Sequence, residues 1–263
     1  MDALDDLSSL FARLWRSYVG LCPSAPRVRA LLGGEAVVND HVAYRTYDHP
    51  RLGIAQLAAP FVAAGYTPRG DYVFEAKKVR ATHFERGPGD PKIFLSELVL
   101  GDCSPALRRI VHALAEAVPA GGFGDPLDAG RPWTLAHGTY EALRSESEYA
   151  AWVAVHGLRV NHFTARVNAL PGSPTLAEVV RRLEDAGVEL SDAGGVIKGS
   201  PAVGLAQAST RADRVRVALA EGEHEVPGAY YELAERHPGP EGPLYEGFVT
   251  ASADRIFEST AAR

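Results

Sequence analysis

Hydrophobic residues recur with helical spacing in some stretches of the chain and alternate as in strands in others. Near the amino terminus, Leu7, Leu10, Leu14 and Tyr18 follow one another at three- and four-residue intervals, which predicts an amphipathic opening helix. Its polar face carries charges of both signs, so we expect it to pack on the core rather than to lie on a membrane. This helix belongs to a predicted helical segment over residues 1–36.

The pattern over residues 37–101 predicts a module of one strand, one helix and three further strands. The first strand covers 41–47, and the helix covers 53–64, where apolar residues fall on one face. Turn residues at Gly70 and at 87–90 are expected to separate the later strands. These strands are expected at 71–74, 79–84 and 93–100.

Residues 158–236 repeat that order and predict a second module. It begins with a strand at 158–168, and a helix follows that starts at Ser173-Pro174 and ends at Gly187. The number of strands after this helix is open by one, because 194–209 can be divided in more than one way. Strands are expected at 195–198, 204–209, 215–220 and 228–236.

The segments outside the modules are predicted to be helical. In the connector, residues 102–157, a helix starts at Ser104-Pro105, with serine as the cap and proline in the first helical position. A second helix is expected at 140–155. Residues 237–263 are expected to form a closing helix at the carboxyl end, and the whole chain to form one compact domain.

A duplicated module of this kind indicates an α+β fold. Two βαβββ units that pack their strands around a cavity form the vicinal oxygen chelate architecture, a curved sheet or half-barrel around a metal site. The first and last strands of each module would line the interior. The candidate chemistry is therefore expected on those four strands.

Composition excludes several classes of function. Hydrophobic residues make up 46% of the 263 residues, as in a globular protein, and the net charge of -6 gives no basic excess with which to grip nucleic acid. No apolar run reaches the roughly 20 residues needed to cross a bilayer. The amino terminus is acidic where a signal peptide would be basic, so we expect a cytoplasmic protein. Cys22 and Cys103 are too few for a disulfide framework.

The first strands of the two modules share one motif. His41 and Arg45 in the first module have the same His-x-x-x-Arg spacing as His162 and Arg166 in the second. Side chains on a strand alternate between faces, so histidine and arginine point the same way, about 13 Å apart at roughly 3.3 Å per residue. A metal ligand and an anion-binding arginine are thus expected in one cavity.

We interpret His41 and His162 as metal ligands. A carboxylate is expected to complete the site, because two imidazoles and one carboxylate leave open positions, as in non-haem Fe(II) oxygenases. Glu232, on the last strand of the second module, is the first choice. Glu97, on the last strand of the first module, is the main rival and would make a four-ligand site if both bound, and Glu246 is a weaker rival.

Arg45 is the candidate for catalytic contact with the substrate anion, because a guanidinium matches a carboxylate with two parallel hydrogen bonds. Arg166 either serves the other end of the cavity or only pairs with an acid. Polar residues in predicted strands are further candidates for substrate contact. They are Lys92, Ser96, Gln207 and Ser209.

Four stretches around these residues resemble the 2-oxoadipate dioxygenase/decarboxylase family, and the resemblance spans nearly the whole chain. They are NDHVAYR at 39–45, KIFLSEL at 92–98, VNHFT at 160–164 and VPGAYYE at 226–232. More distantly, the chain is similar to 4-hydroxyphenylpyruvate dioxygenase and hydroxymandelate synthase around YELAER at 231–236, and at 247–248 and 256–259. That second similarity favours Glu232 over Glu97.

The resemblance implies an Fe(II) centre held by His41, His162 and Glu232, with Arg45 at the substrate carboxylate. It also implies the partners, a small 2-oxo acid and dioxygen, and the reaction: oxidative loss of carbon dioxide followed by hydroxylation of the same molecule. For 2-oxoadipate the product would be 2-hydroxyglutarate. The sequence carries no pattern that specifies an oligomer.

Two other functions fit the same pattern. A divalent-metal isomerase or lyase of this fold would use Glu97 or Glu232 as a general base and would need no oxygen. A metal-free small-molecule binding protein would use only the cavity and its arginines, and changing His162 would then leave ligand affinity intact.

Overall fold

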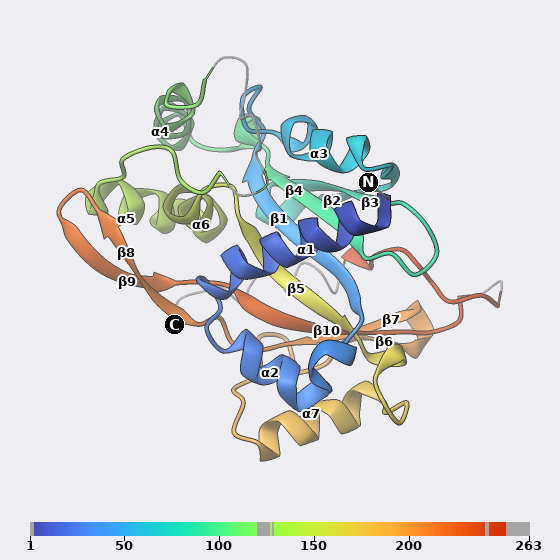
Figure 1. The fold of residues 1–263 in the computed structure, drawn as a ribbon. Coiled ribbons are helices and arrows are strands. Elements are labelled where there is room, and N and C mark those ends of the chain that lie inside the picture. The colour runs from blue at the N-terminus through green and yellow to red at the C-terminus, as the bar shows by residue number, and fades with distance from the viewer. Residues whose placement is uncertain (1–2, 120–126, 128, 240–241, 251–263) are drawn as a thin grey trace.

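The computed structural model describes residues 3–119, 127, 129–239 and 242–250 (Figure 1). Its first half begins with helices α1 (Ala3–Val19) and α2 (Ala25–Leu32). A strand, a helix and three strands follow, in the predicted order. They are β1 (Asn39–Tyr47), α3 (Ile54–Ala63), β2 (Thr67–Phe74), β3 (Val79–Glu85) and β4 (Lys92–Leu98).

The second half repeats this order after a helical connection. The connecting helices are α4 (Pro105–Glu116), α5 (His137–Glu146) and α6 (Glu148–His156). The repeated elements, with one hairpin inserted before the last strand, are β5 (Val160–Arg166), α7 (Leu176–Asp185), β6 (Lys198–Ser200), β7 (Leu205–Ser209), β8 (Arg214–Leu219), β9 (Gly222–Pro227) and β10 (Tyr230–Arg236).

One eight-stranded sheet carries both repeats, in the order β2-β3-β4-β1-β5-β10-β7-β6. The central strands β1 and β5 are antiparallel, and each pairs in parallel with the last strand of its own repeat, β4 and β10. The repeats are therefore related by a pseudo-twofold axis between β1 and β5. This curled half-barrel confirms the predicted α+β fold of the vicinal oxygen chelate type.

Alternate residues of the central strands face opposite layers. Phe163 and Tyr231 pack edge-on against Trp15 of α1, with ring centroids 5.1 and 6.1 Å apart. In Figure 1, α1 lies across the sheet over β5. Their neighbours His162 and Glu232 line the cavity on the other face. The period-2 pattern thus separates a helix-covered apolar face from a polar, cavity-lining one.

Gly70 lies within β2, so its prediction as a turn residue was wrong. A Cβ there would come within 3.0 Å of the Tyr72 hydroxyl and 3.1 Å of the His83 ring, and glycine leaves room for both. The chain instead turns at Glu75–Lys77, followed by Lys78 in the left-handed conformation with φ 56°. Lys78 is not a residue type that marks such a turn in a sequence.

Two of the predicted helices also differ in their bounds. The helix expected at 140–155 is two helices, because Ser147 has an extended backbone and its side chain caps α6 by accepting the N–H of Ala150. The helix expected from Ser173 starts after Thr175, which forms a capping box with Glu178. Helix α2 lies in the predicted helical segment 1–36, although its bounds were not predicted. The Ser104-Pro105 helix start is confirmed, with Ser104 accepting the N–H of Leu107.

The strand expected at 215–220 exists but lies outside the main sheet. It is β8, which pairs only with β9 in a two-stranded hairpin. The hairpin end is tied to the connector, where the Ala220 N–H donates to the Leu135 carbonyl at 2.9 Å. The second repeat therefore keeps only three strands after its helix in the sheet.

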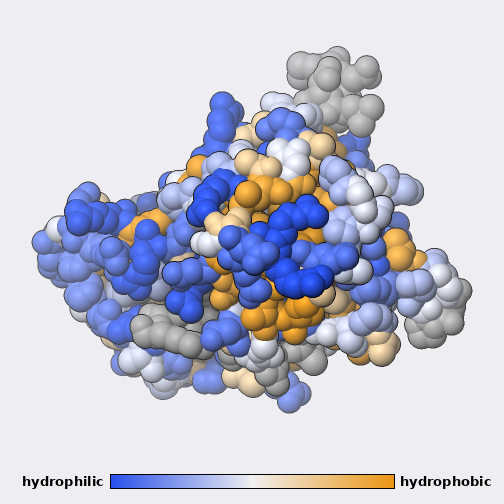
Figure 2. Space-filling view, turned by 90° about the horizontal axis from the view of Figure 1, so that it is seen from below, coloured by the Kyte–Doolittle hydropathy of each residue, from blue (hydrophilic) through white to orange (hydrophobic). Residues whose placement is uncertain are grey.

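Residues 237–239 and 242–249 of the predicted closing helix are not helical, and 240–241 and 251–263 lie outside the described residues, as do 256–259 of the family resemblance. Among the helices that are described, none has the length and apolar character to span a bilayer. Figure 2 views the molecule from below the orientation of Figure 1. Hydrophilic residues cover most of this face, and hydrophobic residues gather near its middle.

Candidate metal centre

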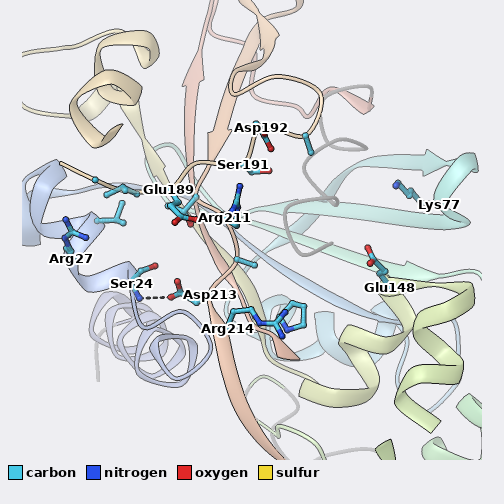
Figure 3. Close-up of a pocket in the computed structure, with 17 residues that line it drawn as sticks. Ser24, Arg27, Lys77, Glu148, Glu189, Ser191, Asp192, Arg211, Asp213 and Arg214 are labelled. Atoms are coloured by element: carbon cyan, nitrogen blue, oxygen red, sulfur yellow. Dashed lines mark hydrogen bonds and ion pairs between the residues drawn. The ribbon is translucent and has the colours of Figure 1, made fainter. Parts of the chain in front are cut away.

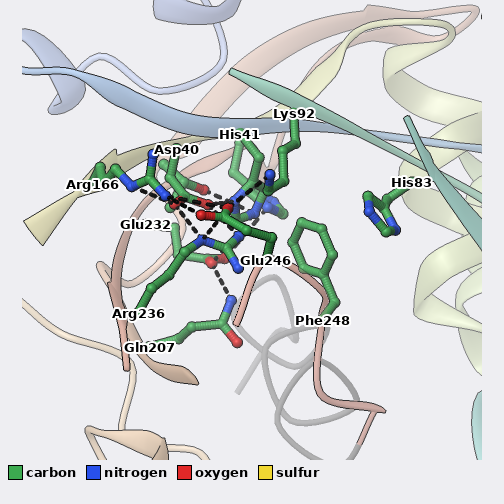
Figure 4. Close-up of polar contacts among 12 residues, drawn as sticks. Asp40, His41, His83, Lys92, Arg166, Gln207, Glu232, Arg236, Glu246 and Phe248 are labelled. Carbon is green, nitrogen blue, oxygen red and sulfur yellow. Dashed lines mark hydrogen bonds and ion pairs between the residues drawn. The ribbon is translucent and has the colours of Figure 1, made fainter. Parts of the chain in front are cut away.

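Three potential metal ligands meet in the cavity formed by the central strands; Figure 4 labels two of them, His41 and Glu232. They are His41 on β1, His162 on β5 and Glu232 on β10, and one donor atom of each lies within 4.8 Å of the others. The Nε2 atom of His41 is 3.6 Å from Glu232 Oε1, and that of His162 is 3.4 Å from Oε2. All three residues are buried. The convergence predicted from sequence is present.

The strand register explains the convergence. Glu232 lies opposite Thr164, two residues beyond His162, so both side chains emerge on the cavity face of neighbouring parallel strands. In the first repeat, the residue two beyond the partner of His41 is Phe94, opposite Ala43. Phe94, and not Glu97, is therefore the counterpart of Glu232. The cavity thus has three potential ligands, two imidazoles and one carboxylate, and an apolar ring where a pseudo-symmetric fourth ligand would lie.

Glu97 points away from this cavity and is engaged elsewhere. It lies opposite Thr46 in the register, next to the cavity-lining Ser96. Its carboxylate accepts hydrogen bonds from Arg80 at 2.6 Å and from the N–H of Ile54, at the start of α3, at 2.8 Å. A four-ligand site with Glu97 is not compatible with this placement.

Each histidine is oriented by the residue before it. Asp40 and Asn161 are the extra residues of two β-bulges, where the pairing of β1 with β5 shifts by one. A bulge re-aims a side chain that would otherwise point to the opposite face. Asp40 Oδ1 lies 2.8 Å from His41 Nδ1, and Asn161 Oδ1 lies 3.1 Å from His162 Nδ1. With an acceptor at each Nδ1 atom, Nε2 is the nitrogen of each ring that could bind a metal. Thr164 Oγ1 lies 3.1 Å from His41 Nε2 and would give up that contact if a metal bound there.

Asp40 also binds the side chain of Arg236, the last residue of β10. Two hydrogen bonds of 2.7 Å join the guanidinium to the carboxylate, and the Arg236 side chain is fully buried. The remaining nitrogen, Nη1, donates to the carbonyls of Tyr245 and Gly247 at 2.8 and 2.9 Å. Arg236 thereby holds the 245–248 segment over the site, where the Phe248 ring contacts His41 at a centroid distance of 4.8 Å (Figure 4).

The electrostatics of the three donors fit a divalent cation. Burial raises the pKa of Glu232 to about 8, although a hydrogen bond from Gln207 opposes the rise. Burial lowers the pKa of His41, and burial together with the charges of His41 and Arg45 lowers that of His162. Glu232 Oε2 is buried and has no hydrogen-bond partner among the described residues. A cation would satisfy that oxygen and favour the ionised carboxylate and neutral imidazoles.

Asp40 differs from Glu232 because its countercharge is already present. Burial alone would raise the pKa of the Asp40 carboxyl, but the Arg236 guanidinium and the hydrogen bond with His41 hold it well below its usual range. Asp40 therefore stays ionised and accepts from His41 without being a ligand itself.

Arg45 and Ser96 line the same cavity as the three donors. Arg45 is 2% exposed, and its guanidinium carbon lies 5.3 and 5.5 Å from the ring centroids of Tyr149 and Trp152 on α6. Ser96 donates to the Tyr44 carbonyl at 2.9 Å. The cavity thus places a buried cation on the same strand face as His41, four residues further along β1.

The other predicted contacts have different positions. Gln207 lines the cavity, where its amide donates to Glu232 Oε1 at 2.6 Å. Ser209 is buried opposite Glu232 in the register but does not line the cavity. Arg166 and Lys92 do not line it either; each forms an ion pair of 2.9 Å with Glu246. The alternative that Arg166 pairs with an acid describes its position in the structure.

A larger surface cleft lies elsewhere, beside α2 and the loops around 187–193 and 210–214 (Figure 3). Its charged groups are partly paired with one another or with the backbone. Asp213 accepts the N–H of Ser24 at 2.7 Å, and Arg211 pairs with Glu189 at 3.2 Å. None of the three converging donors lines it, so we assign the candidate site to the smaller, buried cavity.

Sequence reasoning missed Asp40, Asn161, Arg236 and Phe248 as parts of the site. One signal was available for two of them, since each of the two predicted histidine ligands directly follows an Asp or Asn. Arg236 and Phe248 carried no such signal, because their contacts depend on how the chain returns after β10.

Comparisons with known proteins identify related chains. A sequence profile described as 2-oxoadipate dioxygenase/decarboxylase matches residues 28–119 and 131–243. The chloroplastic 2-oxoadipate dioxygenase/decarboxylase of Arabidopsis thaliana is 35% identical over 250 residues, which cover 84% of this chain and 67% of the relative.

Solved structures extend the similarity to the fold. A hydroxyglutarate synthase from Oryza sativa, crystallised with 2-oxoadipate, is 30% identical with a TM-score of 0.85, over 98% of this chain and 93% of that one. A Shewanella frigidimarina protein with a provisional hydrolase label is 43% identical with a TM-score of 0.89, over 93% of this chain and 98% of that one. From the extent of the profile match and these identities, the chain belongs to the 2-oxoadipate dioxygenase/decarboxylase family.

Proposed function

We propose that this protein is an Fe(II)-dependent enzyme that converts 2-oxoadipate and dioxygen into 2-hydroxyglutarate and carbon dioxide. The observation that carries the proposal is the placement of three buried donors, His41, His162 and Glu232, in one small cavity with Arg45. The names of the relatives from Arabidopsis thaliana and Oryza sativa support the choice of reaction and substrate.

The donor set leaves room for two reactants at one metal. His41, His162 and Glu232 would hold the ion and leave coordination positions open, and the counterpart of Glu232 in the first repeat is Phe94, which cannot coordinate. When bound, Fe(II) supplies the positions at which the 2-oxo acid chelates and dioxygen is activated. Asp40 and Asn161 hold the imidazoles in the tautomer that presents Nε2.

Arg45 is proposed to bind the carboxylate of the substrate that does not chelate the metal. The two aromatic rings of Tyr149 and Trp152 pack about its guanidinium and exclude water. A charge-assisted, bidentate hydrogen bond is strong in such surroundings and fixes the orientation of the acid. The substrate would then span from the metal position to Arg45.

The aromatic residues around the site are proposed to keep it dry. Phe94 and Phe248 pack against each other with ring centroids 4.8 Å apart, and Phe248 also covers His41. Arg236 fixes the backbone on which Phe248 sits. Exclusion of water protects a reactive centre from side reactions and strengthens the electrostatic contacts inside it.

Oxygen consumption tests the proposal. Protein loaded with Fe(II) without oxygen should consume one dioxygen for each 2-oxoadipate, with release of one carbon dioxide. With isotopically labelled dioxygen, 2-hydroxyglutarate should carry both atoms, one in the new carboxylate and one in the hydroxyl group. No substrate-dependent oxygen uptake with any 2-oxo acid would reject the oxygenase, and turnover without oxygen would indicate the metal isomerase instead.

A further inference from the structure

Only one of the two polar atoms of the Asn161 side-chain amide has a hydrogen-bond partner among the described residues. Asn161 is 1% exposed and lines the cavity beside the three donors. Its Oδ1 is 3.1 Å from His162 Nδ1, whereas its Nδ2 is buried and has no hydrogen-bond partner among the described residues. A buried amide that leaves a donor unused needs a reason.

Metal binding by His162 determines which end of the amide is free. If Nε2 binds the metal, the ring proton is on Nδ1, and Nδ1 must donate. Only the oxygen of the amide can accept that hydrogen bond, so the –NH2 group must be the end of the amide that makes no hydrogen bond to His162. The assignment of Oδ1 and Nδ2 therefore follows from the chemistry of the ligand as well as from the coordinates.

The comparison with Asp40 shows that the free end is not a general property of the fold. Asp40 occupies the equivalent bulge and accepts from His41 in the same way, but its second oxygen is bound by Arg236 at 2.7 Å. The first repeat thus has an anion whose countercharge is provided by the protein. The second repeat has a neutral amide that lines the same cavity as Arg45 and whose Nδ2 has no hydrogen-bond partner among the described residues.

We propose that Asn161 contacts the substrate: Oδ1 orients His162, and Nδ2–H donates a hydrogen bond to an oxygen of the 2-oxo acid bound beside it. The inference rests on the proposed function, which supplies the anionic ligand. It assigns the donor to the end of the substrate near the metal position, because Asn161 is the neighbour of His162, while Arg45 binds the opposite end. Aspartate at position 161 would keep the acceptor and replace the donor by a negative charge.

Calorimetry without oxygen on Asn161→Asp tests this division of roles. Affinity for Fe(II) should not fall below that of the wild type by more than about threefold, because the acceptor for His162 Nδ1 remains. The dissociation constant for 2-oxoadipate, measured on the iron-loaded protein, should rise by at least about 30-fold, because a repulsive contact replaces a charge-assisted hydrogen bond.

A second variant covers the case in which Asn161→Asp does not fold. Asn161→Ala removes both functions, so its affinity for Fe(II) should fall about 10-fold and its affinity for 2-oxoadipate at saturating Fe(II) at least about 10-fold. Binding of 2-oxoadipate within threefold of the wild type in iron-saturated Asn161→Asp or Asn161→Ala would overturn the inference. A wild-type protein that binds Fe(II) but no 2-oxo acid would overturn the proposed function, and the substrate contact with it.

Discussion

Removal of the Asp40 carboxylate is expected to destabilise the protein strongly. In Asp40→Ala, the guanidinium of Arg236 loses two hydrogen bonds of 2.7 Å while its side chain stays buried, and His41 loses the acceptor at Nδ1. The carbonyls of Tyr245 and Gly247 still accept from Nη1 but carry no full charge, and the carboxylate that remains nearby, that of the partly exposed Glu246, lies 3.8 Å from Nε. The variant therefore leaves a buried cation with only partial compensation.

The expected loss of folding free energy follows from the burial of the Asp40–Arg236 ion pair. Loss of one partner of a buried ion pair typically costs about 3–5 kcal/mol. Asp40→Asn should cost less, about 1.5–3 kcal/mol, because its amide oxygen can still accept one hydrogen bond from a charged group. Affinity for Fe(II) should also fall about 10- to 100-fold in Asp40→Ala, since the partner that orients His41 is gone.

Urea unfolding of the metal-free protein at pH 7, with a chelator present, measures the stability term. Replacing both partners, Asp40→Ala with Arg236→Met, should recover at least about 2 kcal/mol relative to the sum of the single variants, because no uncompensated charge is then buried. An Asp40→Ala loss below about 1 kcal/mol, or additive single effects, would refute the account of this pair.

Three further predictions concern other residues. Arg45→Ala should weaken 2-oxoadipate binding at least about 100-fold with little change in Fe(II) affinity. The matched variant Arg166→Ala should change substrate affinity less than about threefold. Calorimetry checks both, and an equal loss of Fe(II) affinity in Arg45→Ala would indicate a structural role. Glu232→Gln should abolish stoichiometric Fe(II) binding, as measured by metal analysis, because the anionic ligand is lost. Burial lowers the pKa of His156 to about 4, and its ring lies 2.7 Å from the Pro227 carbonyl. Acid should therefore favour the unfolded state as pH falls from about 6.5 to 4, and His156→Gln should lose about 2–3 kcal/mol less than the wild type in urea unfolding between pH 7 and pH 4.5; equal losses would contradict this reasoning.

The sequence predicted the repeat and the convergence because both depend on local periods. Alternation along β1 places His41 and Arg45 on one face, and that inference needs no knowledge of the neighbouring strands. The distinction between Glu97 and Glu232 needs the register of parallel strands that are far apart in sequence. Register puts Phe94 where simple comparison of the repeats had put Glu97.

The residues that orient the histidines and cover the site were harder to predict from the sequence. A bulge is a mismatch between two strands, so alternation within β1 alone would direct Asp40 to the face opposite His41. The contact of Asp40 with Arg236 joins residues from the two ends of the fold. The position of Phe248 depends in turn on Arg236, so it can be predicted only when the buried pair of Asp40 and Arg236 is known.

Anomalous X-ray scattering at the iron edge, on crystals grown with Fe(II) without oxygen, tests the central claim most directly. The account predicts one iron peak per chain, about 2 Å from the Nε2 atoms of His41 and His162 and from a carboxylate oxygen of Glu232. Iron at another place, or at this place with Glu97 as a ligand, would contradict it.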